Sequence, residues 1–174
     1  HHIHWKVSNH MSTLSVDTIQ GQTTAANVKM PAGYVIQTVN TQSDTAATTS
    51  STSFVSTSVA ATITPKYNTS KILVICQCAL HQTTTVSNGS HVAAQIHRGS
   101  TAIGFQVEVG TREGSGGGFV DNAGAGNILS VLDSPSTTSA TTYTVYMKAL
   151  SNVVTSTINR NSSGSTITLM EIAQ

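Results

Sequence analysis

The chain has 174 residues, of which only 9% are charged and 5% aromatic, and its acidic and basic residues nearly balance. This composition argues against binding along a nucleic-acid backbone, which needs clustered Lys and Arg, and no run approaches the ~18 apolar residues of a membrane-spanning helix. About three residues in ten are Ser or Thr. Because the β-branched Thr and Val favour strands over helices, the composition predicts an all-β fold.

The N-terminal part of the chain is expected to lie outside the folded domain. Residues 1–10 hold four of the seven histidines and have the composition of a purification-tag remnant. We take Met11 as the natural start, and residues 12–19 lack the basic segment and apolar core of a signal peptide. Residues 11–33 include one alternating run but too few apolar residues to fold alone. We therefore expect an extended arm or shaft end there, followed by a single domain over residues 34–174.

Short apolar or alternating runs, separated by turn residues, predict strands along this domain. Their spacing of about 8–12 residues is typical of an antiparallel β-sandwich, most simply a jelly roll. Between the first two runs, residues 40–52 are expected to form a loop rich in Ser and Thr. The predicted strands are residues 34–39, 54–64, 71–82, 92–98, 103–109, 128–132, 142–150, 153–158 and 165–172.

Two strands are expected in the interior of a sheet. Residues 71–82 form the most apolar run and predict the central core strand. Residues 165–172 are also apolar, and an apolar strand left at a sheet edge would aggregate. Apolar residues on both faces of residues 142–150 suggest that one face of this strand packs against a neighbouring molecule.

Two strand pairings are predicted from local patterns. Asn88-Gly89 is typical of a tight hairpin turn. We therefore expect the strands on either side of this turn to pair, which would place His97 opposite Leu80. We also expect residues 153–158 to pair with residues 142–150, which precede them in the chain.

The two cysteines, Cys76 and Cys78, are predicted to be reduced, buried and small apolar side chains. Residues i and i+2 of a strand lie on one face about 6.5–7 Å apart at Cα, which is at or beyond the limit for a disulfide. A metal or redox site would need a C-x-x-C spacing or additional ligands, which are absent here. Reduced thiols suit assembly in a cytoplasm.

Several phrases of the sequence, taken in order, resemble a group of tail-fibre or fibre-like structural proteins of marine bacteriophages. The resemblance covers nearly all of residues 11–174. The phrases are Val16-Asp-Thr-Ile-Gln-Gly21 with Met30-Pro-Ala-Gly-Tyr-Val-Ile-Gln37, then Ala61-Thr-Ile-Thr-Pro-Lys66 with Ser70-Lys-Ile-Leu-Val74, and finally Leu132-Asp-Ser-Pro135 with Ser165-Thr-Ile-Thr-Leu-Met-Glu-Ile172.

The resemblance implies a virion protein, assembled in the host cytoplasm, that ends a fibre or decorates a particle. By this resemblance the chain is expected to form a homotrimer whose fold is similar to the tumour-necrosis-factor and C1q type of jelly roll. Residues 11–33 would join it to other virion proteins. Its loops would face a host-surface glycan or protein. The affinity of each polar site would be weak, and three copies in one trimer would multiply it. A purely architectural virion protein is an alternative.

Catalytic and metal-binding residues are not predicted. Ser is too common to mark a nucleophile, and a Ser-His-Asp site needs a base and an orienting acid beside it. The expected pairing places His91 and His97 on one strand face and His81 on the other. A metal ring about a trimer axis would need only one His per chain, but no H-x-H spacing favours it. We expect no cofactor.

A tail-associated glycan hydrolase or esterase with a site between subunits is the enzymatic alternative. Such chemistry needs two carboxylates at a defined separation. Glu108 and Glu113, or Glu113 and Asp121, are the pairs that could converge, but solvated loop carboxylates are the simpler interpretation. Asp133, before Ser-Pro, is interpreted as a turn residue.

The glycine-rich segment over residues 110–118 is predicted to be an exposed loop. It lacks the lysine of a phosphate-binding loop, and a floppy connector is an equally simple interpretation. Together with the Asn88-Gly89 turn it defines the predicted ligand-contacting residues. These are Asn88, His91, Arg112, Glu113, Phe119, Asp121 and Asn122.

Overall fold

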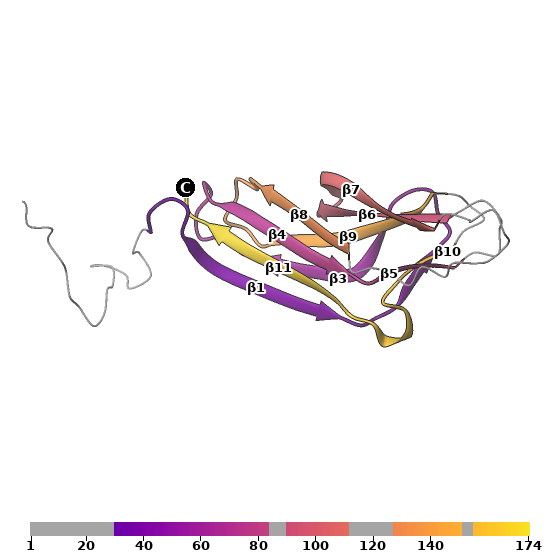
Figure 1. Cartoon of the computed structure of the whole chain (residues 1–174). Coiled ribbons are helices and arrows are strands. Elements are labelled where there is room, and N and C mark those ends of the chain that lie inside the picture. The colour runs from indigo at the N-terminus through magenta and orange to yellow at the C-terminus, as the bar shows by residue number, and fades with distance from the viewer. Residues whose placement is uncertain (1–29, 84–89, 112–126, 151–154) are drawn as a thin grey trace, which may run out of the picture. The chain divides into compact units, whose positions relative to one another are not determined.

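The computed structural model describes residues 30–83, 90–111, 127–150 and 155–174. These residues form antiparallel β-sheets, as the composition predicts, and the arrangement is consistent with a β-sandwich (Figure 1). The strands are β1 (Val35–Ser43), β2 (Ala47–Thr49), β3 (Val55–Ile63), β4 (Lys71–Cys78), β5 (Leu80–Thr83), β6 (Ser90–Arg98), β7 (Thr101–Thr111), β8 (Asn127–Asp133), β9 (Thr141–Ala149), β10 (Thr155–Ile158) and β11 (Ser165–Ile172), with a short 3₁₀ turn at Arg160–Ser162.

The first four-stranded sheet has the order β1-β11-β4-β8, and its strands run side by side in Figure 1. Both strands expected in a sheet interior are there, because β11 lies between β1 and β4, and β4 lies between β11 and β8. Burial alternates along them: Ile167 and Leu169 are fully buried, whereas Thr168 and Met170 are partly exposed. One face of this sheet therefore packs into the core and the other faces outward.

The second four-stranded sheet has the order β3-β9-β6-β7. Along β9, Tyr143, Val145, Met147 and Ala149 are fully buried on one face, as the sequence pattern predicts. The buried faces of the two sheets together form one core of apolar side chains. Clusters of this kind are the main favourable contribution to folding.

The predicted pairings of two strands are wrong. A short sheet of order β2-β10-β5 pairs β10 with β2 and β5, and not with β9. The predicted hairpin between β5 and β6 also does not form. Strand β6 pairs with β7 and β9, whereas β5 belongs to the short sheet β2-β10-β5. The expected loop over residues 40–52 is also partly strand, since β1 extends to Ser43 and β2 follows it. Local patterns cannot distinguish a hairpin from a connection between two packed sheets.

The two cysteines are free and buried, as predicted. Their Sγ atoms lie 3.2 Å apart, within one face of β4. The hydrogen bond between the two thiols, followed by burial, raises the pKa of Cys76 far above its usual range. Cys76 therefore stays in the thiol form, which is the unreactive one.

A buried carboxylate fastens the end of the first sheet. Glu171 of β11 is fully buried, and its Oε1 accepts hydrogen bonds from the backbone N–H groups of Lys66 and Tyr67 at 2.8 and 3.2 Å. Its Oε2 accepts a third bond, from Nε2 of Gln37 at 2.6 Å. The carboxylate thus ties β1, β11 and the turn before β4 together, and its hydrogen bonds offset the cost of burying the group.

Candidate functional site

The structure describes only one of the predicted ligand-contacting residues. His91 lies exposed on β6, its backbone opposite Gly110 of β7, and its carbonyl oxygen accepts a bond from the N–H of Leu150 at 3.2 Å. Asn88, Arg112, Glu113, Phe119, Asp121 and Asn122 lie outside the described residues.

The strand ends that adjoin the predicted loops lie together. Thr83, the last residue of β5, is paired with Thr155, the first of β10, and Ser90 at the start of β6 is paired with Thr111 at the end of β7. Strand β5 also contacts β6. We call this group of strand ends, which includes His91, the loop end.

A depression lined by hydroxyl-bearing residues opens at the loop end. It measures about 600 Å³ and is widely open to solvent. Its walls come from β2, the two residues after it, and the first residue of β10. The lining residues are Thr48, Thr49, Ser50, Ser51 and Thr155.

Hydrogen bonds between residues close in sequence hold the wall of this depression, which we call the rim, in place. The N–H of Ser51 donates to Oγ1 of Thr49 at 3.0 Å, and the hydroxyl of Ser51 donates to the carbonyl oxygen of Ser53 at 2.9 Å. The carbonyl oxygen of Ser51 accepts a bond from the N–H of Ala149 at 2.8 Å, which fixes the rim to β9. Such side-chain to backbone bonds are the usual reason that Ser and Thr favour turns.

The lining determines what the depression can bind. A hydroxyl group both donates and accepts hydrogen bonds, and each described residue of the lining carries one. A neutral, polyhydroxylated ligand offers the same two functions, so the groups match in either direction. Such contacts are weak singly, which makes several copies necessary for stable attachment. Sequence reasoning did not single out these residues, because it assigned residues 48–51 to a loop rich in Ser and Thr and Thr155 to a strand; their density of hydroxyl groups was the available signal.

An aromatic cluster lies on the outward face of the second sheet. The rings of His97 and Tyr146 stack with centroids 3.8 Å apart and an interplanar angle of 11°. Phe54 packs against His97 at 5.8 Å, and Nζ of Lys148 lies 4.7 Å from the centroid of the Phe54 ring. The last distance is within the range of a cation–π interaction. The residues come from β6, β9 and the segment before β3, so only the sheet register brings them together.

His97 has one ring nitrogen that lacks a partner among the described residues. The residue is 7% exposed, and its Nδ1 lies 3.3 Å from the carbonyl oxygen of Ser100. Because a carbonyl oxygen only accepts, Nδ1 carries the proton in that bond. Nε2 is buried and unpartnered. The stacking of Tyr146 covers a face of the imidazole ring, so the histidine is packed within the chain.

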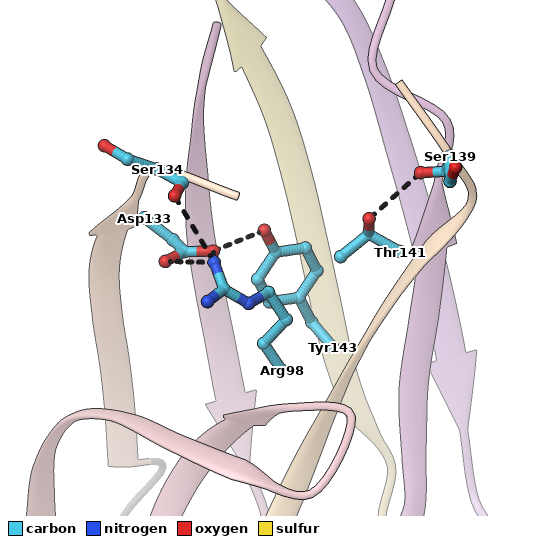
Figure 2. A network of polar contacts seen from close by, with 6 residues as sticks. All are labelled: Arg98, Asp133, Ser134, Ser139, Thr141 and Tyr143. Carbon is cyan, nitrogen blue, oxygen red and sulfur yellow. Dashed lines mark hydrogen bonds and ion pairs between the residues drawn. The ribbon is translucent and has the colours of Figure 1, made fainter. Parts of the chain in front are cut away.

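A polar network joins the two four-stranded sheets (Figure 2). Nη1 of Arg98, on β6, donates to Oδ1 and Oδ2 of Asp133, on β8, at 3.0 and 2.8 Å. The hydroxyl of Tyr143, on β9, donates to the same Oδ2 at 2.7 Å. Burial, followed by this hydrogen bond, raises the pKa of Tyr143 above its usual value. The side chain of Asp133 is therefore a bridge between sheets, which the interpretation as a turn residue did not anticipate.

The remaining acids and histidines of the described residues are dispersed. Glu108 is exposed and accepts a hydrogen bond from Gln106 at 2.6 Å. His81 lies on β5, opposite Thr157, and not opposite Ile96 as the hairpin predicted. Within the described ranges, no three His, Cys, Asp or Glu side chains are grouped closely enough to hold a metal ion.

Comparison with known protein families finds no family model that matches this chain, and comparison with curated proteins finds no significant match. In the described part of the chain, no helix has the length and hydrophobicity needed to cross a membrane.

Proposed function

We propose that this chain is a non-enzymatic structural protein of a virus particle, a bacteriophage tail-fibre head or receptor-binding head of jelly-roll type. In this proposal it forms homotrimers, joins other virion proteins through residues 11–33, and presents the loop end to a glycan on the host surface. The observation that carries the proposal is the hydroxyl-lined depression at the loop end, which joins a rigid antiparallel scaffold to a surface suited to neutral, polyhydroxylated ligands.

The scaffold supports this function for a physical reason. Strand β10 is paired on both sides and β2 is paired with β10, so the groups along them keep a defined geometry at the surface. Thr48, Ser50 and Thr155 are exposed, and their hydroxyl groups can exchange water for sugar hydroxyls at little net cost. Three copies on one particle then raise the apparent affinity by several orders of magnitude.

Binding of the intact protein to whole bacterial cells and to an array of immobilised bacterial-surface oligosaccharides tests the proposal. The double variant Thr48→Val and Thr155→Val removes two hydroxyl groups with little change in shape. We expect its apparent affinity to fall at least about tenfold, since each lost hydrogen bond of this kind is worth about 1 kcal/mol. Thr101→Val, at an exposed position at the other end of β7, is the matched control and is expected to bind normally.

Two results would contradict the proposal. Failure of the unmodified protein to bind any cell or oligosaccharide would leave an architectural virion protein as the remaining interpretation. Equal loss of binding in the Thr101→Val control and in the double variant would show that the depression is not the contact surface.

A further inference from the structure

The outward face of the sheet β1-β11-β4-β8 carries apolar side chains that no described residue covers fully. Leu132 is 53% exposed and Ile128 is 66% exposed, both on β8. The outward-facing apolar residues of β4 and β11 are partly exposed. We call this surface the apolar face; it consists of Leu73, Ile75, Ile128, Leu132, Met170 and Ile172.

The strand register makes these side chains contiguous. Leu132 of β8 is paired with Leu73 of β4, and Leu73 is paired with Met170 of β11, so the three form one row across the sheet. Ile75 follows Leu73 by two residues on β4 and so lies on the same face of the sheet. Its position along the strand is midway between those of Leu132 and Ile128. Side chains paired directly across strands have Cβ atoms about 5 Å apart. The row of Leu132, Leu73 and Met170, with Ile75 beside it, is therefore a contiguous apolar strip on this face.

The outward face of the other four-stranded sheet has a different character. Its β9 positions are Thr142, Thr144, Tyr146 and Lys148. Tyr146 is covered by the stacked ring of His97, so its apolar surface is used within the chain. The surface most in need of a partner therefore lies on the first sheet, and not along residues 142–150, where the sequence pattern suggested a packed neighbour.

Charge favours a second copy of this chain as the partner. Around a three-fold axis every copy turns the same residues toward the axis, so like charges on that face would repel one another. Among the outward positions of the four strands of this sheet, Lys71 is the one charged residue. The remaining outward positions are apolar or are Thr, Ser, Asn and Gln. An unlike partner would more often be selected by complementary charge, which this face does not offer.

The size of the face suits a stable interface. A sheet of four strands, each about eight residues long, has a projected area of roughly 500 Å², from ~4.8 Å between strands and ~3.3 Å per residue. Interfaces of standard size bury about 800 Å² on each partner. The face of this sheet, with its apolar and uncharged polar side chains, is therefore large enough to supply most of one such surface. Apolar patches on monomers that reach a few hundred Å² are often functional.

A second exposed apolar group lies beside β8, at the edge of this sheet. A methyl group on Gly104 of β7 would lie 3.2 Å from Cγ2 of Val131 on β8, so the two strands touch there. The next residue, Phe105, is 94% exposed. It sits where the register between β6 and β7 shifts, and such bulges redirect side chains. Two neighbouring apolar patches suit a closed ring, in which each copy uses one patch toward each neighbour.

We propose that copies of this chain bind one another through the apolar face, with the row Leu132, Leu73 and Met170 at its centre. This inference rests on the homotrimer of the proposed function and identifies its contact surface. It leaves the loop end free to face the host.

Light scattering after gel filtration, over a range of protein concentrations, tests the assignment on the full chain. We expect the unmodified protein to have three times the mass of one chain. Leu132→Lys and Ile128→Lys are each expected to raise the dissociation constant at least about a hundredfold, because an unpaired charge would be buried within the contact. Ser56→Lys adds the same charge at an exposed position on β3, the edge of the other sheet farthest from β7, and is expected to remain trimeric.

The outcomes separate this inference from the proposed function. Dissociation of both Lys variants, with native circular dichroism and with the control still trimeric, supports the apolar face as the interface. Lys variants that remain trimeric overturn the assignment but leave a trimeric head intact. A monomeric unmodified protein overturns both the assignment and the trimer, and binding to host cells, measured separately, would still test the receptor function. Dissociation of the Ser56→Lys control as well would also overturn the assignment, because the effect would not be specific to this face.

Discussion

The buried carboxylate of Glu171 allows a quantitative prediction about stability. In the variant Glu171→Gln the side chain keeps its size, and its amide oxygen can still accept the N–H groups of Lys66 and Tyr67. The amide NH₂ would then face Nε2 of Gln37, which now donates to Oε2 at 2.6 Å and also to the carbonyl oxygen of Thr64 at 2.8 Å. One charge-assisted hydrogen bond is therefore lost, and two become neutral.

The magnitude follows from these contacts. A hydrogen bond to a charged group contributes about 1.5–3 kcal/mol, and a neutral one about 1 kcal/mol. The lower cost of burying a neutral amide offsets part of this loss. We expect Glu171→Gln to lower the free energy of unfolding by about 2 kcal/mol. Glu171→Ala is expected to lower it by about 4 kcal/mol, because two buried N–H groups lose their acceptor and a cavity is left.

Urea unfolding followed by far-ultraviolet circular dichroism measures the effect. All variants must be compared at one protein concentration, since association contributes to apparent stability. Asn40→Ala is the control, because Asn40 makes an exposed hydrogen bond to Thr168, and we expect a change below about 0.5 kcal/mol. Equal or greater stability of Glu171→Gln relative to the unmodified protein would refute the reasoning, since it would mean that burying the charge costs as much as its hydrogen bonds contribute.

Three further predictions concern single side chains. The folded state holds the pKa of Tyr143 above its usual value of 10.0, so this group's contribution to stability is complete below pH 10 and falls as the pH rises further. A titration followed by tyrosine absorbance is expected to show one tyrosine that ionises only at higher pH. Loss of this late step in Tyr143→Phe checks the assignment. Cys76 and Cys78 are expected to resist a thiol reagent until the protein unfolds, and labelling of both at the rate of free cysteine under native conditions would contradict their burial. Gly104→Ala is expected to lower the free energy of unfolding by about 1–2 kcal/mol, because Gly104 has φ +72° and the new methyl group would crowd Val131; an unchanged urea midpoint would show that β7 adjusts freely.

The sequence by itself determined the fold class and the positions of most strands. Alternation of apolar and polar residues is a local property, because successive side chains of a strand point to opposite faces whatever the strand pairs with. The period alone places Tyr143, Val145 and Met147 on one face of β9, and that face is the buried one. The free thiols of Cys76 and Cys78 follow from it as well, since their spacing on one strand face is poorly suited to a disulfide.

Pairing between strands was decided only by the tertiary structure. The Asn88-Gly89 signal predicted a hairpin, yet the strands on either side belong to different sheets, because turn residues specify a change of direction and not a partner. The bridge from Arg98 to Asp133, the stacking of His97 on Tyr146 and the row of Leu132, Leu73 and Met170 each join residues far apart in the chain. Contacts of this kind depend on which strands become neighbours, and that is settled by the packing of the whole core and not by any local run of residues.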